Sequence, residues 1–510
     1  MKLVEPEGVT AGNHFPGMKI TLSPQDAWQP LPPGEWNEDA ARHLLRRVGW
    51  SAQPPEVARA LRDRLTPTLE RLFPVELEAM PMPQTVAELE EDTPDFVARV
   101  RAAAPADRRA ILQKAREQSR DALLDLTIRW LQYASAPAHA AGEKWTLFLG
   151  NVYVVAAEKV QNTALLFQHQ DILRRCALGP APALTKAVLR SPAMIRYLDL
   201  QDSRVGAPNE NFARELMELF TLGIGHYTEN DIKQAARAFT GYVQRQGQFV
   251  FAPRLHDRGE KTVFGETGPF DGDGVIDAIY RQPAAGRHLP ARLTSFYLSA
   301  DPLPDEHLAA LGRWWAGTGY DLRALAHRYF GSRLFFEPQF RGGYIKSPVQ
   351  FFLGLEQDFA LNVPPLPRRL APAFRQMGQM LYNPPNVRGW VGGRDWISST
   401  PLEARRTVAR ALFQPFDESR RNADELRAVT AARAEGLTTF AVDRAYLDQY
   451  AGLTPEATVA RLTRDLLPLP VDGRFRHALA AALHGPPAQA EPRLRNAIIA
   501  ILETPDYQLC

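Results

Sequence analysis

Cysteine is nearly absent from this chain of 510 residues, which contains only Cys176 and Cys510. Two cysteines cannot build a disulfide framework or a cysteine-rich zinc site. No run of about 18 apolar residues occurs, so we expect no membrane-spanning segment. The first residues also lack the continuous apolar stretch of a signal peptide. We therefore expect a soluble, cytoplasmic protein.

An excess of charge of one sign is also lacking. The chain has 60 Lys and Arg residues against 58 Asp and Glu residues, a formal net charge of +2. Such a balance does not indicate a surface for nucleic acid or for acidic membranes, so we expect no nucleic-acid partner. Hydrophobic residues make up 45% of the chain and charged residues 23%, which is typical of a folded globular protein.

The signatures of several common enzyme classes are missing. No histidine has an acidic residue three positions before it, and no two histidines are four positions apart. This excludes the usual zinc-protease and ferritin-type di-iron motifs. A P-loop, a dinucleotide-binding glycine pattern and a G-x-S-x-G elbow are absent too, which argues against common nucleotide and esterase mechanisms.

Helical periodicity dominates the residues that are present. Apolar positions spaced by three and four predict helices over residues 38–50, 121–134 and 144–160. Residues 242–270 differ, because short aromatic and β-branched runs alternate there with glycine-rich turns. The sequence therefore predicts a mainly α fold, a large multi-helix globular bundle with a small antiparallel β-hairpin insert at 242–270.

The domain organisation follows from composition. We expect an extended N-terminal segment over residues 1–35 and a single helical domain over residues 36–510. Residues 52–120 are rich in charge and contain proline clusters, so this part of the domain is a candidate variable insertion.

The stretch "PNENFARELMELFTLGIGHYTEN" (208–230) predicts a pair of antiparallel helices. Asn209 suits the N-cap of the first helix, Gly223 suits a left-handed stop that lets Ile224 pack back, and Thr228 starts the second helix. The apolar stripe expected to be buried comprises Phe212, Leu216, Leu219 and Phe220.

The polar side of the first helix has two interpretations. Glu210, Arg214 and Glu218 stand at i, i+4 spacing and can form ordinary surface ion pairs, each worth about 0.2–0.5 kcal/mol. Alternatively, Glu215 and Glu218 are catalytic acids, and Asn211 and Arg214 bind a substrate beside them.

The segment "HDRGEK" (256–261) places His256, Asp257 and Lys261 at an expected hairpin turn. An adjacent histidine and aspartate on a rigid turn can share a proton or a metal ion. The alternative is a solvated turn in which Asp257 bonds its own backbone.

The loop "YNPPNVRGWVGGRDW" (382–396) is stiffened by proline and glycine. Indole rings beside amide and guanidinium donors are typical of a sugar- or peptide-binding cleft, while the alternative is an aromatic plug across the helix bundle. The candidate substrate-binding residues in this loop are Asn383, Asn386, Arg388, Trp390 and Trp396.

These stretches, with "KSPVQFFLG" (346–354), "MGQMLYNPPNVRGWVGGRDWISSTPLEAR" (377–405) and the N-terminal "ARHLLRRVGW", resemble the bacterial "domain of unknown function 1800" family. The resemblance runs from about residue 36 to residue 510. It implies no settled activity. Members of the family are largely exported, and they are often encoded beside proteins related to the alkaline phosphatase superfamily, which makes such a protein the implied partner.

The chain departs from the family pattern at "LGNVY" (149–153), where Gly150 and Val152 replace two histidines of a Trp-His-Asn-His-Phe run. An activity that depends on those histidines cannot be carried over to this chain. The chain also lacks the export signal of most members.

Two hypotheses of function remain. In the first, the chain is a hydrolase or lyase acting on a polar, glycan-like substrate, and Glu215 and Glu218 face His256, Asp257 and Lys261 as general acid and base or around one divalent cation. In the second, it is a non-catalytic scaffold or binding partner of an alkaline-phosphatase-superfamily-like protein and makes contact through the loop at 382–396.

Overall fold

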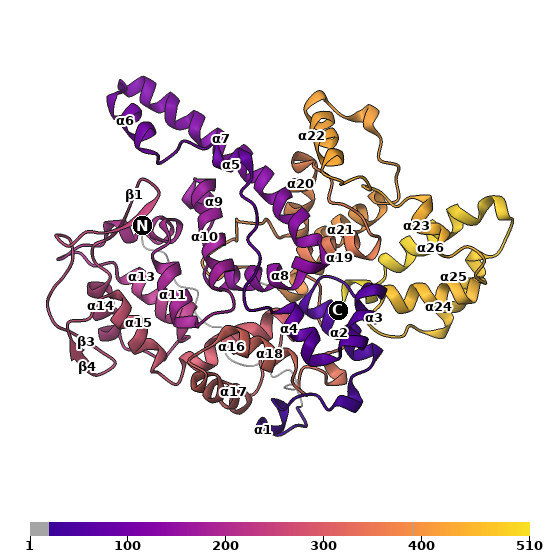
Figure 1. Ribbon diagram of the computed structural model, residues 1–510, viewed down its shortest axis with the longest axis horizontal. Coiled ribbons are helices and arrows are strands. Elements are labelled where there is room, and N and C mark those ends of the chain that lie inside the picture. Colours follow the sequence, from indigo (N-terminus) through magenta and orange to yellow (C-terminus); the bar gives the residue numbers. More distant parts are fainter. Residues whose placement is uncertain (1–19, 391) are drawn as a thin grey trace.

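The computed structural model describes residues 20–390 and 392–510 (Figure 1). It confirms the mainly α fold, since the strands within these ranges form only two small two-stranded antiparallel sheets. The residues 20–35 that precede the main body contain two short helices, and the Trp28 indole N–H donates to the carbonyl of His307 over 2.8 Å. Residues 1–19 of the predicted N-terminal segment lie outside the described ranges.

The regular elements within residues 20–202 are all helices. They are α1 (Pro24–Ala27), η1 (Pro33–Glu35), α2 (Glu38–Val48), α3 (Pro54–Asp63), α4 (Leu65–Leu72), α5 (Gln84–Ala87), α6 (Pro94–Ala102), α7 (Pro105–Ser135), α8 (Pro137–Val152), α9 (Ala157–Val160), α10 (Thr163–Cys176), α11 (Ala181–Leu189), α12 (Pro192–Tyr197) and η2 (Leu200–Asp202).

The middle part contains both sheets. Its elements are α13 (Glu210–Glu215), the π-helix η3 (Leu216–Thr221), α14 (Glu229–Ala238), β1 (Tyr242–Arg245), β2 (Gln248–Phe251), β3 (Lys261–Val263), β4 (Glu266–Gly268), α15 (Gly272–Tyr280), α16 (Ala285–Tyr297), α17 (Asp305–Gly317), α18 (Leu322–Phe330) and η4 (Pro338–Phe340).

The last part is helical again. Its elements are α19 (Pro348–Asp358), α20 (Pro367–Met377), η5 (Gly393–Ile397), α21 (Ser399–Ala411), η6 (Glu418–Arg420), α22 (Ala423–Ala434), α23 (Arg444–Asp448), α24 (Pro455–Leu466), α25 (Gly473–Leu483), η7 (Pro487–Gln489), α26 (Ala490–Leu502) and η8 (Asp506–Gln508).

The predicted helix over 144–160 is interrupted, because α8 ends at Val152 and α9 begins at Ala157. Between them, the carbonyl of Tyr153 bonds the buried His169 ring at 3.1 Å, and the N–H of Ala157 donates to the carbonyl of Tyr382 over 2.8 Å. These partners replace the helical hydrogen bonds and come from distant segments, so periodicity alone does not indicate the break.

The β insert consists of two hairpins. Strands β1 and β2 are joined at Gln246 and Gly247, and β3 and β4 at Phe264 and Gly265, all four with positive φ. Two consecutive residues with positive φ form the type I′ turn that suits the twist of a tight hairpin. The segment 256–261 therefore connects the two hairpins. The prediction from the sequence that this segment is itself a hairpin turn is wrong.

Helix α8 joins the two large hydrophobic cores of the described chain. Trp145 and Phe148 belong to the core built mainly from residues 27–340, and Leu147 belongs to the core shared with residues 349–507. The same helix carries Glu143, which is fully buried and forms an ion pair with Arg174 at 2.6 Å. A buried pair of this kind needs both partners, because either charge alone would be strongly destabilising.

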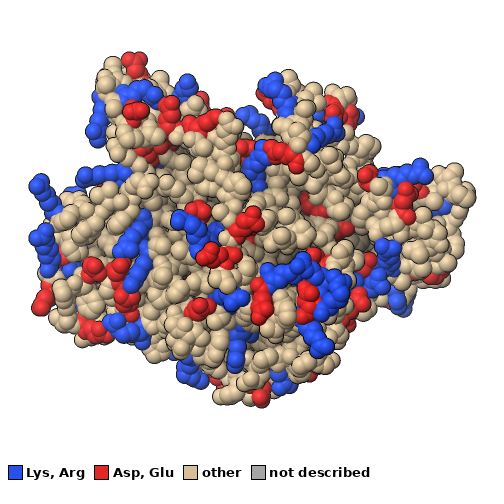
Figure 2. Space-filling model, viewed as in Figure 1, with Lys and Arg blue, Asp and Glu red and all other residues tan. Residues whose placement is uncertain are grey.

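The surface shows interspersed acidic and basic side chains on the face drawn in Figure 2, with a gathering of Lys and Arg over α2 and α3. Helix α6 and the first half of α7, both within the candidate insertion, project from the body (Figure 1). None of the helices in the described ranges is long and apolar enough to cross a membrane.

Candidate functional site

The helix that carries the candidate acids is fixed at its start by Asn209. As predicted, its side-chain oxygen caps the helix by accepting from the N–H of Phe212 over 3.0 Å. Its side-chain nitrogen donates to the carbonyls of Leu198 at 2.8 Å and Asp199 at 3.2 Å. The start of α13 is therefore attached to the end of α12.

This helix is not regular, because α13 ends at Glu215 and continues as the π-helix η3. The N–H of Leu222 donates to the carbonyl of Met217, five residues back, over 2.8 Å. The wider turn shifts the phase of the helix faces. Met217 is completely buried, whereas Leu219, which was predicted to belong to the buried stripe, is only partly buried. Turns of this kind are frequent at functional sites.

Two side chains hold the π turn. The hydroxyl of Thr221 donates to the carbonyl of Leu216 over 2.6 Å, and the ring of His288 on α16 bonds the carbonyl of Leu219 at 2.8 Å. Burial lowers the pKa of His288 to about 4, so the ring is neutral near pH 7 and acts as the N–H donor.

Arg214 does not form the predicted ion pairs along its own helix. Its guanidinium binds both carboxylate oxygens of Glu229 on α14, at 2.9 and 2.7 Å. A carboxylate presented to the planar guanidinium fork in this way is a better partner than one at i±4 on the same helix. Within residues 20–390 and 392–510, Glu215 and Glu218 consequently form no ion pair with Arg214 or with any other side chain.

Glu215 and Glu218 are both partly buried and act on each other. Glu218 accepts a hydrogen bond from the hydroxyl of Tyr227 over 2.7 Å. Burial and the negative charge of Glu218 raise the pKa of Glu215, against the opposing charge of Arg388. Burial also raises the pKa of Tyr197, and the charge of Glu215 adds to this rise. The acid cluster therefore lies beside α12 and the loop at 382–396.

That loop is held in place from α8 and α16. The side-chain oxygen of Asn386 accepts from the N–H of Arg388 over 2.9 Å, and that of Asn151 on α8 accepts from the N–H of Trp390 over 2.8 Å. Arg292 on α16 donates to the carbonyls of Asn151 at 2.7 Å and Arg388 at 3.3 Å. Asn151 therefore determines where the Arg388 segment lies.

Asn151 stands between Gly150 and Val152, the two positions where the resemblance to the family implies histidine. Gly389, with φ of +86°, presses against Asn151 so closely that any side chain at this position would overlap it. Gly150 lines a small cavity of about 40 Å³ together with Trp390. Val152 is buried in the core.

The other loop candidates mainly contact the protein itself. The side-chain oxygen of Asn383 accepts from the N–H of Glu158 over 3.2 Å, at the start of α9. Trp396 is 6% exposed and packs near Gly378 and Gly392. Asn211, by contrast, is exposed on α13.

In the turn at 256–261, Asp257 forms a two-pronged ion pair with Arg237 of α14, at 2.7 and 3.0 Å. It also accepts from the N–H of Gly259 over 2.9 Å, the backbone contact expected of a structural turn. The hydrogen bond from Arg237 lowers the pKa of Asp257.

The remaining members of this turn are similarly occupied. Lys261 is 2% exposed, and its ammonium donates to the carbonyls of Asp257 at 2.7 Å and Gly259 at 2.9 Å. Burial lowers the pKa of Lys261. The His256 ring bonds the carbonyl of Thr240 at 2.9 Å. These contacts hold the segment between the two hairpins in one conformation.

The candidate residues of the two polar stretches form two groups, one on α13 and η3 and the other in the turn that leads into β3. Helix α14 packs against both α13 and β3. The charges that act on Glu215 come from Glu218, Arg388 and Arg214, whereas those on Asp257 come from Arg237 and Lys261. The approach of the two groups to within reach of one substrate atom remains a prediction.

Tyr227, Tyr197 and Asn151 are candidates that the sequence analysis did not select. Tyr227 stands only nine positions after Glu218 in the same stretch, 208–230. Its hydrogen bond to Glu218 could therefore have been predicted from their proximity in sequence. The sequence pattern at 149–153 singled out only the neighbours of Asn151, Gly150 and Val152. Among residues 20–390 and 392–510, no group of three or more His, Cys, Asp and Glu side chains is placed to hold a metal ion.

Comparison with known proteins matches residues 43–509 to the family described as "Protein of unknown function (DUF1800)". The match spans nearly the whole chain. No curated protein and no solved structure matches it.

Proposed function

This chain belongs to the DUF1800 family, whose description names no activity, and we propose that it is a hydrolase or lyase that works by acid–base catalysis on a polar, glycan-like substrate. Glu215 is the proposed general acid and Glu218 the proposed base. The proposal keeps the acids suggested by the sequence and replaces their proposed partners in the turn at 256–261 with Tyr227 and Arg388.

One observation carries the proposal: two partly buried carboxyl groups, Glu215 and Glu218, lie together while the arginine just before them in sequence, Arg214, is bound to Glu229. A structural ion ladder would have used Arg214 to neutralise them. Burial and the charge of Glu218 raise the pKa of Glu215, which is the direction that a general acid requires.

The neighbouring side chains suggest further roles. Tyr227 orients the Glu218 carboxylate through its hydroxyl. Arg388 is exposed and offers guanidinium donors to a polar or anionic substrate group, and the indole of Trp390 offers an apolar face beside it. Two carboxyl groups on either side of a scissile bond are also the usual equipment for cleaving glycosides.

The experiment is a panel of p-nitrophenyl glycosides and acidic polysaccharides, with release of nitrophenol and formation of unsaturated uronates as readouts. Glu215→Gln and Glu218→Gln should each lower the turnover at least about 100-fold without any loss of stability. Glu210→Gln is the matched control, because Glu210 is exposed in the first turn of the same helix. Full activity in either of the first two variants, or an equal loss in the control, would refute the assignment.

The same assay decides whether a second group of residues has a catalytic role. This group comprises His256, Asp257 and Lys261. Asp257→Asn should weaken the ion pair with Arg237 and lower the melting temperature. If activity falls much further than the folded fraction, the turn belongs to the catalytic site. If both fall together, its role is structural.

A cleft supports the second candidate, a non-catalytic binding partner of an alkaline-phosphatase-superfamily-like protein. It has a volume of about 1000 Å³ and lies along α7, α9, α10 and the segment that includes Asn383. Leu123 and Leu166 line its apolar floor, and Arg116 and Arg375 are among its basic residues. Titration of the purified phosphatase-like protein against wild type and Leu123→Asp tests this candidate, which requires binding that the variant loses.

A further inference from the structure

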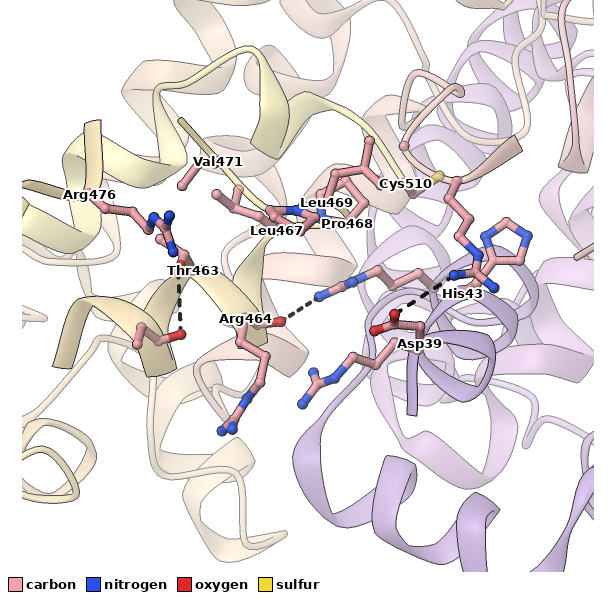
Figure 3. Close-up of a pocket in the computed structure, with 16 residues that line it drawn as sticks. Asp39, His43, Thr463, Arg464, Leu467, Pro468, Leu469, Val471, Arg476 and Cys510 are labelled. Carbon is pink, nitrogen blue, oxygen red and sulfur yellow. Dashed lines mark hydrogen bonds and ion pairs between the residues drawn. The ribbon is translucent and has the colours of Figure 1, made fainter. Parts of the chain in front are cut away.

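A second cavity, of about 260 Å³, lies between α2, the chain near Arg341, and helices α24 and α25 (Figure 3). These elements lie in the right-hand half of Figure 1, whereas α13 and its acids lie in the left-hand half. Typical small-molecule pockets occupy roughly 300–1,000 Å³, so this cavity suits a small ligand. The five arginines that line it are Arg42, Arg46, Arg341, Arg464 and Arg476.

The acidic groups around the cavity do not bind all the N–H groups of these arginines. Arg42 is 6% exposed and pairs with Glu38 at 2.9 Å and Asp465 at 3.0 Å, yet its Nη1 is buried without a hydrogen-bond partner among the described residues. Arg46 donates to the carbonyl of Asp465 over 2.9 Å. The charge of Cys510 also acts on Arg46.

Two arginines at the cavity are free or nearly free. Arg341 lies 3.8 Å from Asp39, a long contact, and its buried Nε has no partner in the described chain. Arg476 is exposed on α25 and forms no ion pair or side-chain hydrogen bond within residues 20–390 and 392–510. A guanidinium with unoccupied N–H groups is the preferred partner of carboxylate and phosphate oxygens.

The opposite wall of the cavity is apolar. Figure 3 shows Leu467, Pro468 and Leu469 along one side of the opening and Arg464 and Asp39 along the other. Leu469 is 42% exposed, which is unusual for leucine in a folded protein and leaves an apolar surface available at the mouth.

We propose that this cavity binds a small amphiphilic oxyanion, a carboxylate or phosphate group carried on a short apolar body. Arg476 and Arg341 hold the anion, and the segment from Leu467 to Leu469 covers the apolar body. The site is separate from the acid cluster, so it stands whether or not Glu215 and Glu218 are catalytic.

The test is calorimetric titration of the full chain with phenyl phosphate, benzoate and phenol at low ionic strength. Either anion should bind with one-to-one stoichiometry, and the one that binds more tightly identifies the head group. Phenol should bind at least about tenfold more weakly, because it is uncharged and its hydroxyl cannot accept charge-assisted hydrogen bonds as an anion does. Equal binding of phenol, or binding of neither anion, would overturn the proposal.

Matched variants locate the binding. Arg476→Gln should weaken the anion about tenfold, as expected for the loss of one charge-assisted hydrogen bond. Arg474→Gln, an exposed position on the same helix that does not line the cavity, should leave affinity unchanged. Leu469→Asp, which adds a negative charge at the mouth, should abolish binding. Equal losses in Arg474→Gln and Arg476→Gln would show general attraction to a basic surface and refute the site.

Discussion

The side-chain oxygen of Asn151 accepts a hydrogen bond from the backbone N–H of Trp390 over 2.8 Å, although the two residues are 239 positions apart. This bond ties the loop at 382–396 to α8. Through it, the half-buried Asn151 fixes the position of the segment that contains Arg388, two positions before Trp390. The charge of Arg388 acts on Glu215.

Replacing Asn151 by alanine should lower the free energy of unfolding by about 1–3 kcal/mol, because the N–H of Trp390 loses its partner. Asn151→Asp keeps the accepting oxygen and nearly the same shape, so it should lose less. Urea denaturation of the two variants measures the difference. A change below about 0.5 kcal/mol for Asn151→Ala would show that the bond is replaceable by water.

Glu215 should make the stability depend on pH. Its pKa in the folded protein is raised above the ordinary value of 4.5, so the folded state binds more protons than the unfolded state in the interval between the two values. The destabilisation is absent below the ordinary pKa and develops as pH rises through the folded one. Glu215→Gln should therefore melt like wild type near pH 4 and at a higher temperature than wild type near pH 7. The opposite order at pH 7 would mean that an unrecognised cation stabilises the carboxylate.

Glu356 on α19 should produce a larger effect of the same sign. It is 1% exposed, its Oε2 has no partner in the described chain, and burial raises its pKa to about 8. Wild type should lose stability as pH rises from about 4.5 to about 8, whereas Glu356→Gln stays neutral. At about 1.4 kcal/mol per pKa unit, the variant should gain on the order of 3–5 kcal/mol relative to wild type across that interval. Denaturant titrations at several pH values provide the measurement, and parallel pH curves for the two proteins would contradict the shift.

Phe212→Ala should cost about 3–5 kcal/mol, the usual loss for a buried aromatic side chain. Phe212 is fully buried, with its ring centroid 5.0 Å from that of Phe239, the residue directly after α14. Ile224→Ala is the control and should change stability by less than about 0.5 kcal/mol, because 70% of Ile224 is exposed. A small loss for Phe212→Ala would mean that α13 and α14 do not depend on this contact.

Much of the helix pair at 209–240 was predictable from local signals. The cap at Asn209 and the helix start at Thr228 both form as expected, the latter as a capping box with Asp231, and Gly223 adopts positive φ. The expected packing of Ile224 is wrong, since the chain after Gly223 points it into solvent. The π turn was not predictable from spacing. A turn with one extra residue rotates all later side chains about the helix axis, and the apolar composition of the helix gives no sign of this rotation.

The candidate site was harder to predict than the fold because its contacts are distant in sequence. Arg214 pairs with Glu229 on the next helix and not with its own i±4 neighbours, and Asn151 bonds Trp390, which lies 239 positions further along the chain. Periodicity and capping rules describe neighbours within about two helical turns, so they cannot select among such partners.

The tie between α8 and the loop has a consequence for the order of events during synthesis. At about 5–20 residues per second, the 239 positions between Asn151 and Trp390 take roughly 12–50 s to translate. Glu215 and Glu218 are made early in that interval, well before Arg388. A nascent chain can therefore form the helix pair early, yet it gains the Glu215–Arg388 arrangement only after the loop at 382–396 has been made.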